Sequence, residues 1–163
     1  MKNFLKFNLL IAFLAVLTGC DLSKYPIDDH PVIKNDTRLL GKWREKEKKE
    51  KSDLYTLTKK SETSYLVTMK EYGMKRTLKY DAFLSDVNNV KFLNVLYKDD
   101  SANGYLFIRL LDINSSGNQT TAAAVSDSMM KYVSSSAAVR ERVRENLNNP
   151  AFYSDTIHFE KVK

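Results

Sequence analysis

Short segments in which apolar and polar residues alternate fill the middle of the chain. In the segment 64–72, Tyr65, Val67 and Met69 occupy every second position. Successive side chains of a β-strand point to opposite faces, so this period of two predicts strands with one buried face. Because each segment is short and ends at a turn signal, the pattern indicates antiparallel strands. The expected strands before the last third of the chain are 39–48, 54–60, 64–72, 75–84, 90–97 and 104–113.

The segments 90–97 and 104–113 are apolar at nearly every position, which is typical of strands covered on both faces. A helix over residues 135–150 can provide the cover. There the alternation stops, and Val139, Val143 and Leu147 recur at a spacing of four, which makes one narrow apolar stripe. Ser135 or Ser136 can cap the start of this helix, and Asn148, Asn149 and Pro150 can end it.

The apolar segment 104–113 has two faces, and the helix can cover only one. We expect Leu106, Ile108 and Leu110 to meet the helix, whereas Tyr105 and Phe107 point to the other face. Alternation then returns over residues 156–162 in a closing strand. The predicted fold class is therefore mainly β with one or two helices (α+β), an antiparallel, barrel-like sheet of about eight strands with a late helix packed on it.

The start of the first expected strand reads Gly41-Lys42-Trp43, which resembles the glycine-x-tryptophan signature of lipocalins. The late helix before a last strand also resembles their layout. The resemblance implies a lipocalin-type barrel in which Trp43 closes one end. The second and third lipocalin motifs are not visible, and no arginine on a late strand matches the tryptophan's usual partner. Without the resemblance, Trp43 is simply the largest core residue of a first strand.

A barrel with a small interior can hold one small apolar or amphipathic ligand. Stripes of aromatic and aliphatic residues at a period of two also form plain core, so they do not name a ligand. The side chains expected to point inward and to line such a pocket are Trp43, Tyr65, Val67, Met69, Leu78, Tyr80, Phe92, Tyr105 and Phe107.

The first nineteen residues have the layout of a secretory signal, with a basic start, a short apolar centre and small residues at the end. The apolar run is shorter than the roughly 20 residues that a membrane span needs. Leu17-Thr18-Gly19-Cys20 resembles the lipobox of bacterial lipoproteins. The resemblance implies cleavage before Cys20 and its modification by diacylglycerol and a further acyl chain such as palmitate. The alternative is an ordinary secretory signal with an incidental cysteine.

These features divide the chain into a signal peptide (1–19), a lipidated tether (20–37) and one globular domain (38–163). The tether is polar and contains Pro26 and Pro31, and a flexible chain of this length spans roughly 20 to 25 Å. Asp28, Asp29 and His30 lie within it and are interpreted as solvated charge, with a metal site as the alternative. No metal or other cofactor is expected.

Charge and composition exclude several functions. The chain has 26 basic and 20 acidic side chains, and removing the signal removes Lys2 and Lys6, which leaves 24 basic ones. This weak excess does not predict nucleic-acid binding, which needs clustered cations. Cys20 is the only cysteine, so an intramolecular disulfide is excluded. No nucleophile elbow, phosphate-binding glycine loop or pair of histidines at metal spacing is found, so the chain is not expected to be an enzyme.

Two non-catalytic functions remain. The first is an adaptor of the bacterial cell envelope, held in the membrane by acyl chains on Cys20, whose surface contacts another envelope protein. The alternative is a lipocalin-like binder of a small apolar or amphipathic ligand. Asp21 follows the lipidated cysteine and resembles the signal that keeps lipoproteins of enteric bacteria in the inner membrane. In a host with two membranes this predicts a domain on the periplasmic face of the inner membrane.

Overall fold

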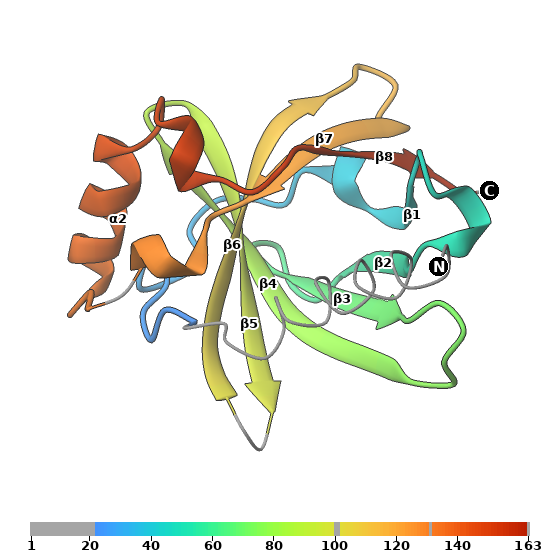
Figure 1. Cartoon of the computed structure of the whole chain (residues 1–163), viewed down its shortest axis with the longest axis horizontal. Coiled ribbons are helices and arrows are strands. Elements are labelled where there is room, and N and C mark those ends of the chain that lie inside the picture. The colour runs from blue at the N-terminus through green and yellow to red at the C-terminus, as the bar shows by residue number, and fades with distance from the viewer. Residues whose placement is uncertain (1–21, 100–101, 131, 163) are drawn as a thin grey trace, which may run out of the picture.

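The computed structural model describes residues 22–99, 102–130 and 132–162. Eight antiparallel strands follow one another around a closed barrel, and the last strand pairs with the first (Figure 1). This confirms the predicted fold class, a lipocalin-like barrel with a late helix. The strands are β1 (Gly41–Glu45), β2 (Leu54–Lys59), β3 (Tyr65–Lys70), β4 (Thr77–Val87), β5 (Val90–Asp99), β6 (Ala102–Ile113), β7 (Gln119–Ala124) and β8 (Ile157–Lys161).

Helical segments connect and flank the strands. The helix α2 (Ser136–Glu145) lies between β7 and β8, and the Ser135 hydroxyl caps it by accepting a hydrogen bond from the Ala138 N–H (3.2 Å). Its stripe is buried as predicted at Val139 and Val143, which are fully covered. The helix is shorter than expected, because it ends at Glu145 with Asn146 as its C-cap, and Leu147, which is 9% exposed, lies just beyond it. Four short 3-10 helices complete the chain, η1 (Thr37–Leu39), η2 (Lys49–Lys51), η3 (Asp127–Met130) and η4 (Pro150–Phe152).

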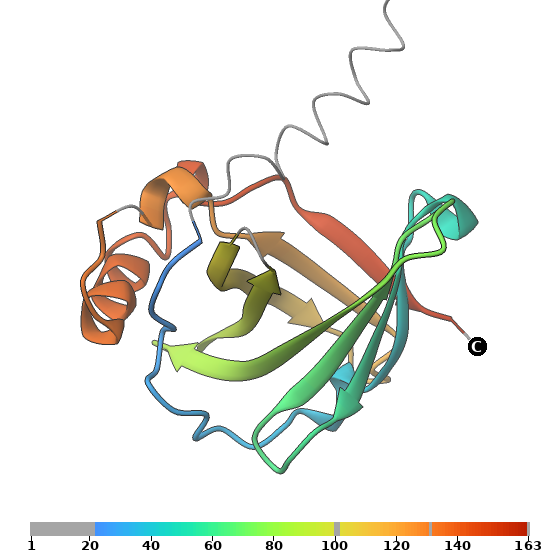
Figure 2. The ribbon, with the colours of Figure 1, turned by 90° about the horizontal axis from the view of Figure 1, so that it is seen from below.

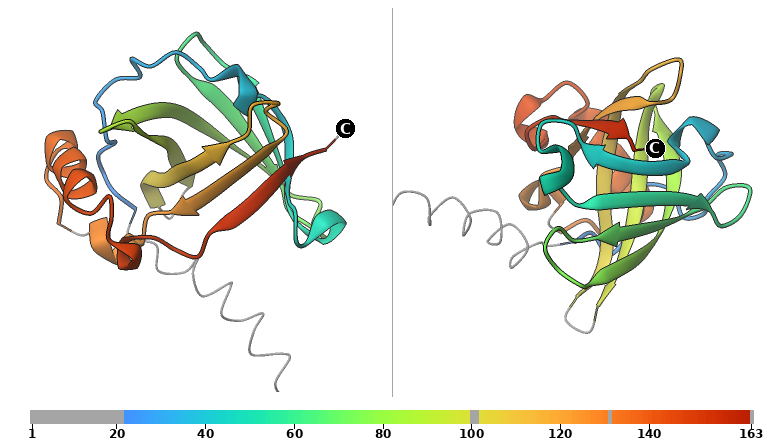
Figure 3. Two further views of the ribbon diagram at one scale, coloured as in Figure 1. Left: turned by 90° about the horizontal axis from the view of Figure 1, so that it is seen from above. Right: turned by 90° about the vertical axis from the view of Figure 1, so that its right-hand side faces the viewer.

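The barrel wall separates two apolar cores. The interior core fills the barrel with residues that include Trp43, Tyr65 and Leu84. The helix core lies outside the wall, where α2 packs on β4, β5 and β6 (Figure 3). Members of the helix core are Ile27, Val87, Phe92, Phe107, Val125, Met130, Val139, Val143, Leu147 and Phe152.

The expected orientation of β6 is wrong. Phe107 is buried against α2 in the helix core and Tyr105 packs beside it, whereas Leu106, Ile108 and Leu110 contact the interior core. The prediction of Phe92 as an inward residue fails in the same way. Both strands are apolar on both faces, so alternation fixes which residues share a face without fixing which face points inward.

The segment after residue 21 is not a flexible tether. It runs along the outside of the barrel (Figure 2) and is fixed there by buried contacts. Ser23 and Ile27 are 3% and 1% exposed. The Ile27 N–H donates a hydrogen bond to Oδ1 of the buried Asn94 (2.9 Å), and Asp28 forms an ion pair with Arg140 of α2 (2.6 Å). The predicted tether is therefore wrong for residues 22–37, which belong to the folded domain.

One end of the barrel, here called the closed end, is covered by η1. Trp43 is 3% exposed, and its indole Nε1 donates a hydrogen bond to the Leu39 carbonyl (2.8 Å). The Lys161 ammonium of β8 lies 5.1 Å from the centre of the Trp43 ring, within the range of a cation–π contact. The lipocalin resemblance implies an arginine as the partner of this tryptophan, and here the cation is a lysine. Gly41 has a φ of +128°, and a Cβ there would lie 3.2 Å from the Lys161 Cε. Trp43 is therefore buried against η1 at this end of the barrel.

Candidate functional site

The inward side chains of the barrel become less buried along its axis. Near the closed end Tyr65, Val67 and Leu84 are buried, whereas toward the opposite end, here called the open end, the inward side chains are only half-buried. Successive strands run in opposite directions, so the open end joins the end of β3, the start of β4, the end of β5 and the start of β6. The half-buried inward side chains there include Tyr55, Met69, Leu78, Tyr80, Tyr97 and Phe159.

The wall of the barrel splits at the open end between β4 and β5. The two strands pair from Asp81–Leu96 to Val87–Val90. Before Asp81, the start of β4 continues along β3, with Leu78 opposite Met69. After Leu96, the end of β5 continues along β6, with Tyr97 opposite Gly104. The strands therefore diverge with their partner hairpins and leave a gap in the wall, here called the β4–β5 cleft.

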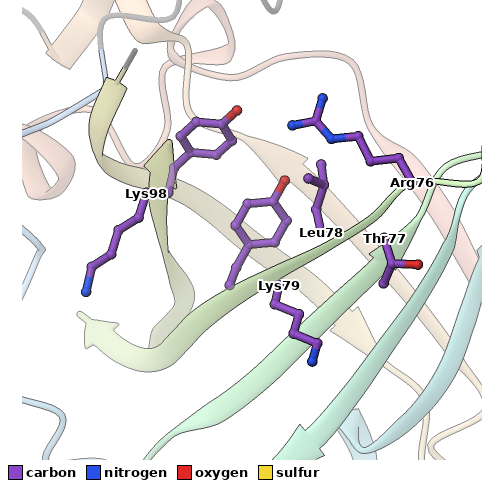
Figure 4. Close-up of a pocket in the computed structure, with 7 residues that line it drawn as sticks. Arg76, Thr77, Leu78, Lys79 and Lys98 are labelled. Atoms are coloured by element: carbon purple, nitrogen blue, oxygen red, sulfur yellow. The ribbon is translucent and has the colours of Figure 1, made fainter. Parts of the chain in front are cut away.

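The β4–β5 cleft has a volume of about 390 Å³, within the roughly 300 to 1,000 Å³ of small-molecule sites. The rings of Tyr80 and Tyr97 stack across the gap, with centroids 5.6 Å apart and planes inclined by 25°. Figure 4 shows Arg76 and Leu78 on one side of β4, and Lys79 and Lys98 directed away from them toward the outer rim. The seven lining residues are Arg76, Thr77, Leu78, Lys79, Tyr80, Tyr97 and Lys98.

The electrostatics of the cleft favour an anion. Three of its seven lining residues are basic and none of the seven is acidic. On β2, two strands away from β4, burial raises the pKa of Tyr55 far above its ordinary value, and the charges of Asp53 and Glu45 add to this effect. The Tyr55 ring packs edge-on against Phe159 (5.9 Å). The inward side chains beside the cleft are therefore mostly aromatic, with the acidic Glu45 and Asp53 close to Tyr55, while the rim of the cleft is cationic.

The structure separates the residues predicted to line a pocket into four groups. Leu78 and Tyr80 line the β4–β5 cleft. Met69 lies opposite Leu78 in the register at the open end. Trp43, Tyr65 and Val67 belong to the filled interior core, and Phe92, Tyr105 and Phe107 lie outside the barrel wall.

Sequence reasoning missed the other five lining residues, Arg76, Thr77, Lys79, Tyr97 and Lys98. Tyr97 is the last residue of the expected strand 90–97, so the sequence placed it in the sheet but not in a pocket. The lysines and the arginine carried no signal, because basic residues on strand ends are ordinarily solvated.

A second groove, of about 590 Å³, lies where β1 and β8 meet the η2 connection. Its lining combines charges of both signs, including Glu50 and Glu160 beside Arg44 and Lys161. Val162 is the one aliphatic residue among its six lining residues. This groove lacks the apolar wall and the uniform charge of the β4–β5 cleft.

Other predicted features are placed as follows. Cys20 and Asp21 lie outside the described residues. Asp28, one of the three residues of the alternative metal site, is instead ion-paired with Arg140. Within the described residues, no group of three or more His, Cys, Asp or Glu is arranged to hold a metal ion. The same residues contain no helix with the length and hydropathy of a membrane span.

Comparison with known proteins finds no matching family model, no matching curated protein and no matching solved structure.

Proposed function

We propose that this chain is a non-catalytic, lipid-anchored protein of the bacterial envelope whose barrel binds a small amphipathic anion in the β4–β5 cleft. The stacked pair of Tyr80 and Tyr97 at a split in the barrel wall carries this proposal. Two aromatic rings with Leu78 provide an apolar surface, and the basic rim provides the charge that attracts an acid. Fatty acids and related acyl compounds combine these properties.

The membrane anchor is the part of the proposal that rests on the sequence alone. Cys20 follows Leu17-Thr18-Gly19 at the end of a signal-like segment. One acyl chain binds a bilayer only marginally and two anchor it stably, so the two or three chains of a lipoprotein would hold the barrel permanently at the membrane. The ligand would then be one available beside the bilayer.

Titration with dansyl-labelled undecanoic acid tests the binding site. We expect saturable binding to the detergent-solubilised protein, and weaker binding of the matching dansyl-labelled alcohol. Leu78→Ser should weaken binding of both probes. The double variant Lys79→Gln with Lys98→Gln should weaken the acid about tenfold, or about 1.4 kcal/mol, and leave the alcohol unchanged. Lys59→Gln at the closed end is the control.

Absence of saturable binding by the unaltered protein would contradict the proposal. So would equal effects of Lys59→Gln and of the double variant, because the acid would then respond to overall charge and not to the cleft.

The adaptor function has one observation in its favour. Tyr132, in the loop before α2, is 99% exposed and has a positive φ of 62°. Exposed aromatic residues on strained backbone are more common at contact surfaces than elsewhere. Crosslinking in intact cells separates the two functions, because a Tyr132→Ser variant should lose a protein crosslink only if this side chain contacts a partner.

A further inference from the structure

The chain is held to the barrel almost from its first described residue. The Ser23 N–H donates to the Tyr105 carbonyl (3.2 Å), and the Tyr105 N–H donates to the Ser23 carbonyl (2.7 Å). Gly104 allows this approach, since a Cβ there would lie 2.5 Å from the Leu22 Cβ and 2.8 Å from the Ser23 oxygen. Only Asp21 separates Leu22 from Cys20. Two residue steps span at most about 7 Å, so an anchor on Cys20 would lie close to this point of the barrel.

This attachment point belongs to the open end. Gly104 and Tyr105 lie near the start of β6, opposite the end of β5. Figure 2 shows that the first described residues, η2 and the turn between β3 and β4 all lie along the same side of the molecule. The chain therefore emerges beside the split wall and not beside η1 at the closed end.

The turn between β3 and β4 presents apolar and basic side chains together at this end. Tyr72 and Met74 are 57% and 58% exposed. The flanking charges are Lys70, Glu71, Lys75 and Arg76, three basic and one acidic. Exposed aromatic residues next to cations suit the boundary between headgroups and acyl chains, where the ring enters the interface and the cation meets phosphate. The η2 connection adds Lys49 and Lys51, with the acidic Glu50 between them.

We propose that the open end of the barrel is a membrane-contacting surface, which rests on an anionic bilayer with Tyr72 and Met74 at headgroup level. The inference rests on the proposed anchor at Cys20. The short link at residues 21–22 leaves no room for the domain to stand away from the bilayer, and the basic turn complements anionic lipid. The β4–β5 cleft then faces the lipid, and an acyl ligand enters it directly from the membrane.

Fluorescence quenching in vesicles tests this orientation. The acylated protein is reconstituted into phosphatidylglycerol–phosphatidylethanolamine vesicles, with a fluorophore on either Tyr72→Cys or Thr63→Cys. Thr63 lies in the turn between β2 and β3, at the closed end. Cys20 is the only native cysteine, so acylation leaves each introduced thiol as the single labelling site. A quencher carried on the lipid headgroup should quench the label at residue 72 several-fold more than the label at residue 63.

Charge reversal provides a second measurement. Lys70→Glu with Lys75→Glu should reduce the quenching at residue 72 by at least half, and replacing phosphatidylglycerol by phosphatidylcholine should have the same effect. Equal quenching at residues 63 and 72, or stronger quenching at residue 63, would overturn the proposed orientation.

Two readouts distinguish failure of the proposed orientation from failure of the proposed function. The mass of the peptide that contains Cys20 reports acylation, and titration with the dansyl-labelled acid in detergent reports the cleft. Neither readout depends on how the barrel sits on the membrane. An acylated protein that binds the acid but shows equal quenching would therefore overturn the orientation alone.

Discussion

At the scale of single residues, Asp36 connects three segments at the closed end. Its carboxylate accepts hydrogen bonds from the Arg38 guanidinium (2.7 Å) and the Lys91 ammonium (3.4 Å). The Tyr65 hydroxyl accepts from the Asp36 N–H (2.6 Å) and donates to the Asp36 carbonyl (3.3 Å). The hydrogen bond from Arg38 lowers the pKa of Asp36 to about 2, with help from the Arg38 backbone N–H and the Lys91 charge and against the effect of burial.

The lowered pKa predicts how stability depends on pH. The carboxylate stabilises the fold fully above its ordinary pKa of 3.8, and this contribution is lost as the pH falls through about 2. Asn keeps an oxygen that can cap η1, so Asp36→Asn removes mainly the charge. Because the Arg38 side chain is 42% exposed, we expect a loss of only about 1 kcal/mol at pH 7.

Urea unfolding of both proteins between pH 7 and pH 2 checks this prediction. The difference between Asp36→Asn and the unaltered protein should shrink below about pH 4. Glu62→Gln, which removes an exposed ion pair with Lys59, is the control and should change stability little at any pH. A difference that stays constant down to pH 2 would contradict the assigned role of the charge.

At the scale of elements, periodicity predicted strands and the helix better than it predicted their faces. The buried stripe of α2 and the alternation of β3 and β4 were readable, because one face of each is more uniformly apolar than the other. In β6, the neighbours Phe107 and Ile108 are both apolar, so their sequence does not show which of the two points outward. In the structure this orientation depends on Asn94. That residue lies opposite Phe107 and places its amide outside the wall, under Ile27. This long-range hydrogen bond leaves no local sequence signal.

β7 shows a second limit of sequence reasoning. Its sequence, Gln119–Ala124, contains two threonines and three alanines, so it has no bulky alternating stripe, and no strand was assigned to it. Ala122 and Ala123 are nevertheless 5% and 4% exposed. The neighbouring strands β6 and β8 determine this strand by pairing with it on both sides. The β4–β5 cleft was unpredictable for a related reason, since it depends on where two strands stop pairing.

The packing of α2 on the barrel gives a stability prediction. Val143 is fully buried in the helix core, so Val143→Ala removes two methyl groups and leaves a cavity. We expect a loss of about 2 kcal/mol and a melting temperature lower by several degrees. Glu145→Ala, on the exposed side of the same helix, should change stability by less than about 0.5 kcal/mol. Thermal unfolding followed by circular dichroism would contradict the packing if the two variants melted together.

The attachment of the N-terminal segment to β6 gives another prediction at this scale. Gly104→Ala places a Cβ where Leu22 and Ser23 lie, so it should separate these residues from β6 without unfolding the barrel. The Tyr105 amide, which donates to Ser23, should then exchange with solvent at least tenfold faster, whereas the Leu93 amide in the paired interior of the sheet should not change. Unchanged exchange at Tyr105 would show that the segment tolerates the methyl group.

At the scale of the whole molecule, the packing of residues 22–37 along the barrel, through Ser23 and Ile27, changes what the proposed lipid anchor would do. A polar segment with two prolines suggested a spacer, but composition does not show that Ile27 meets an amide on β5 or that Asp28 meets α2. A spacer would leave the barrel free to rotate away from the membrane. A packed segment instead fixes the end of the barrel from which an anchor on Cys20 would emerge, so such an anchor would also control the orientation of the cleft.

The expected location of the proposed lipoprotein rests on Asp21. In enteric bacteria, the sorting machinery passes over lipoproteins with aspartate after the lipidated cysteine, so in a host with two membranes we expect this protein on the periplasmic face of the inner membrane. Asp21→Ser should move most of it to the outer-membrane fraction of a density gradient. Cys20→Ser is the control, since it should remain an uncleaved precursor. Recovery of the unaltered protein in the outer membrane, with no shift on Asp21→Ser, would contradict the sorting role of Asp21 and leave the lipid anchor intact.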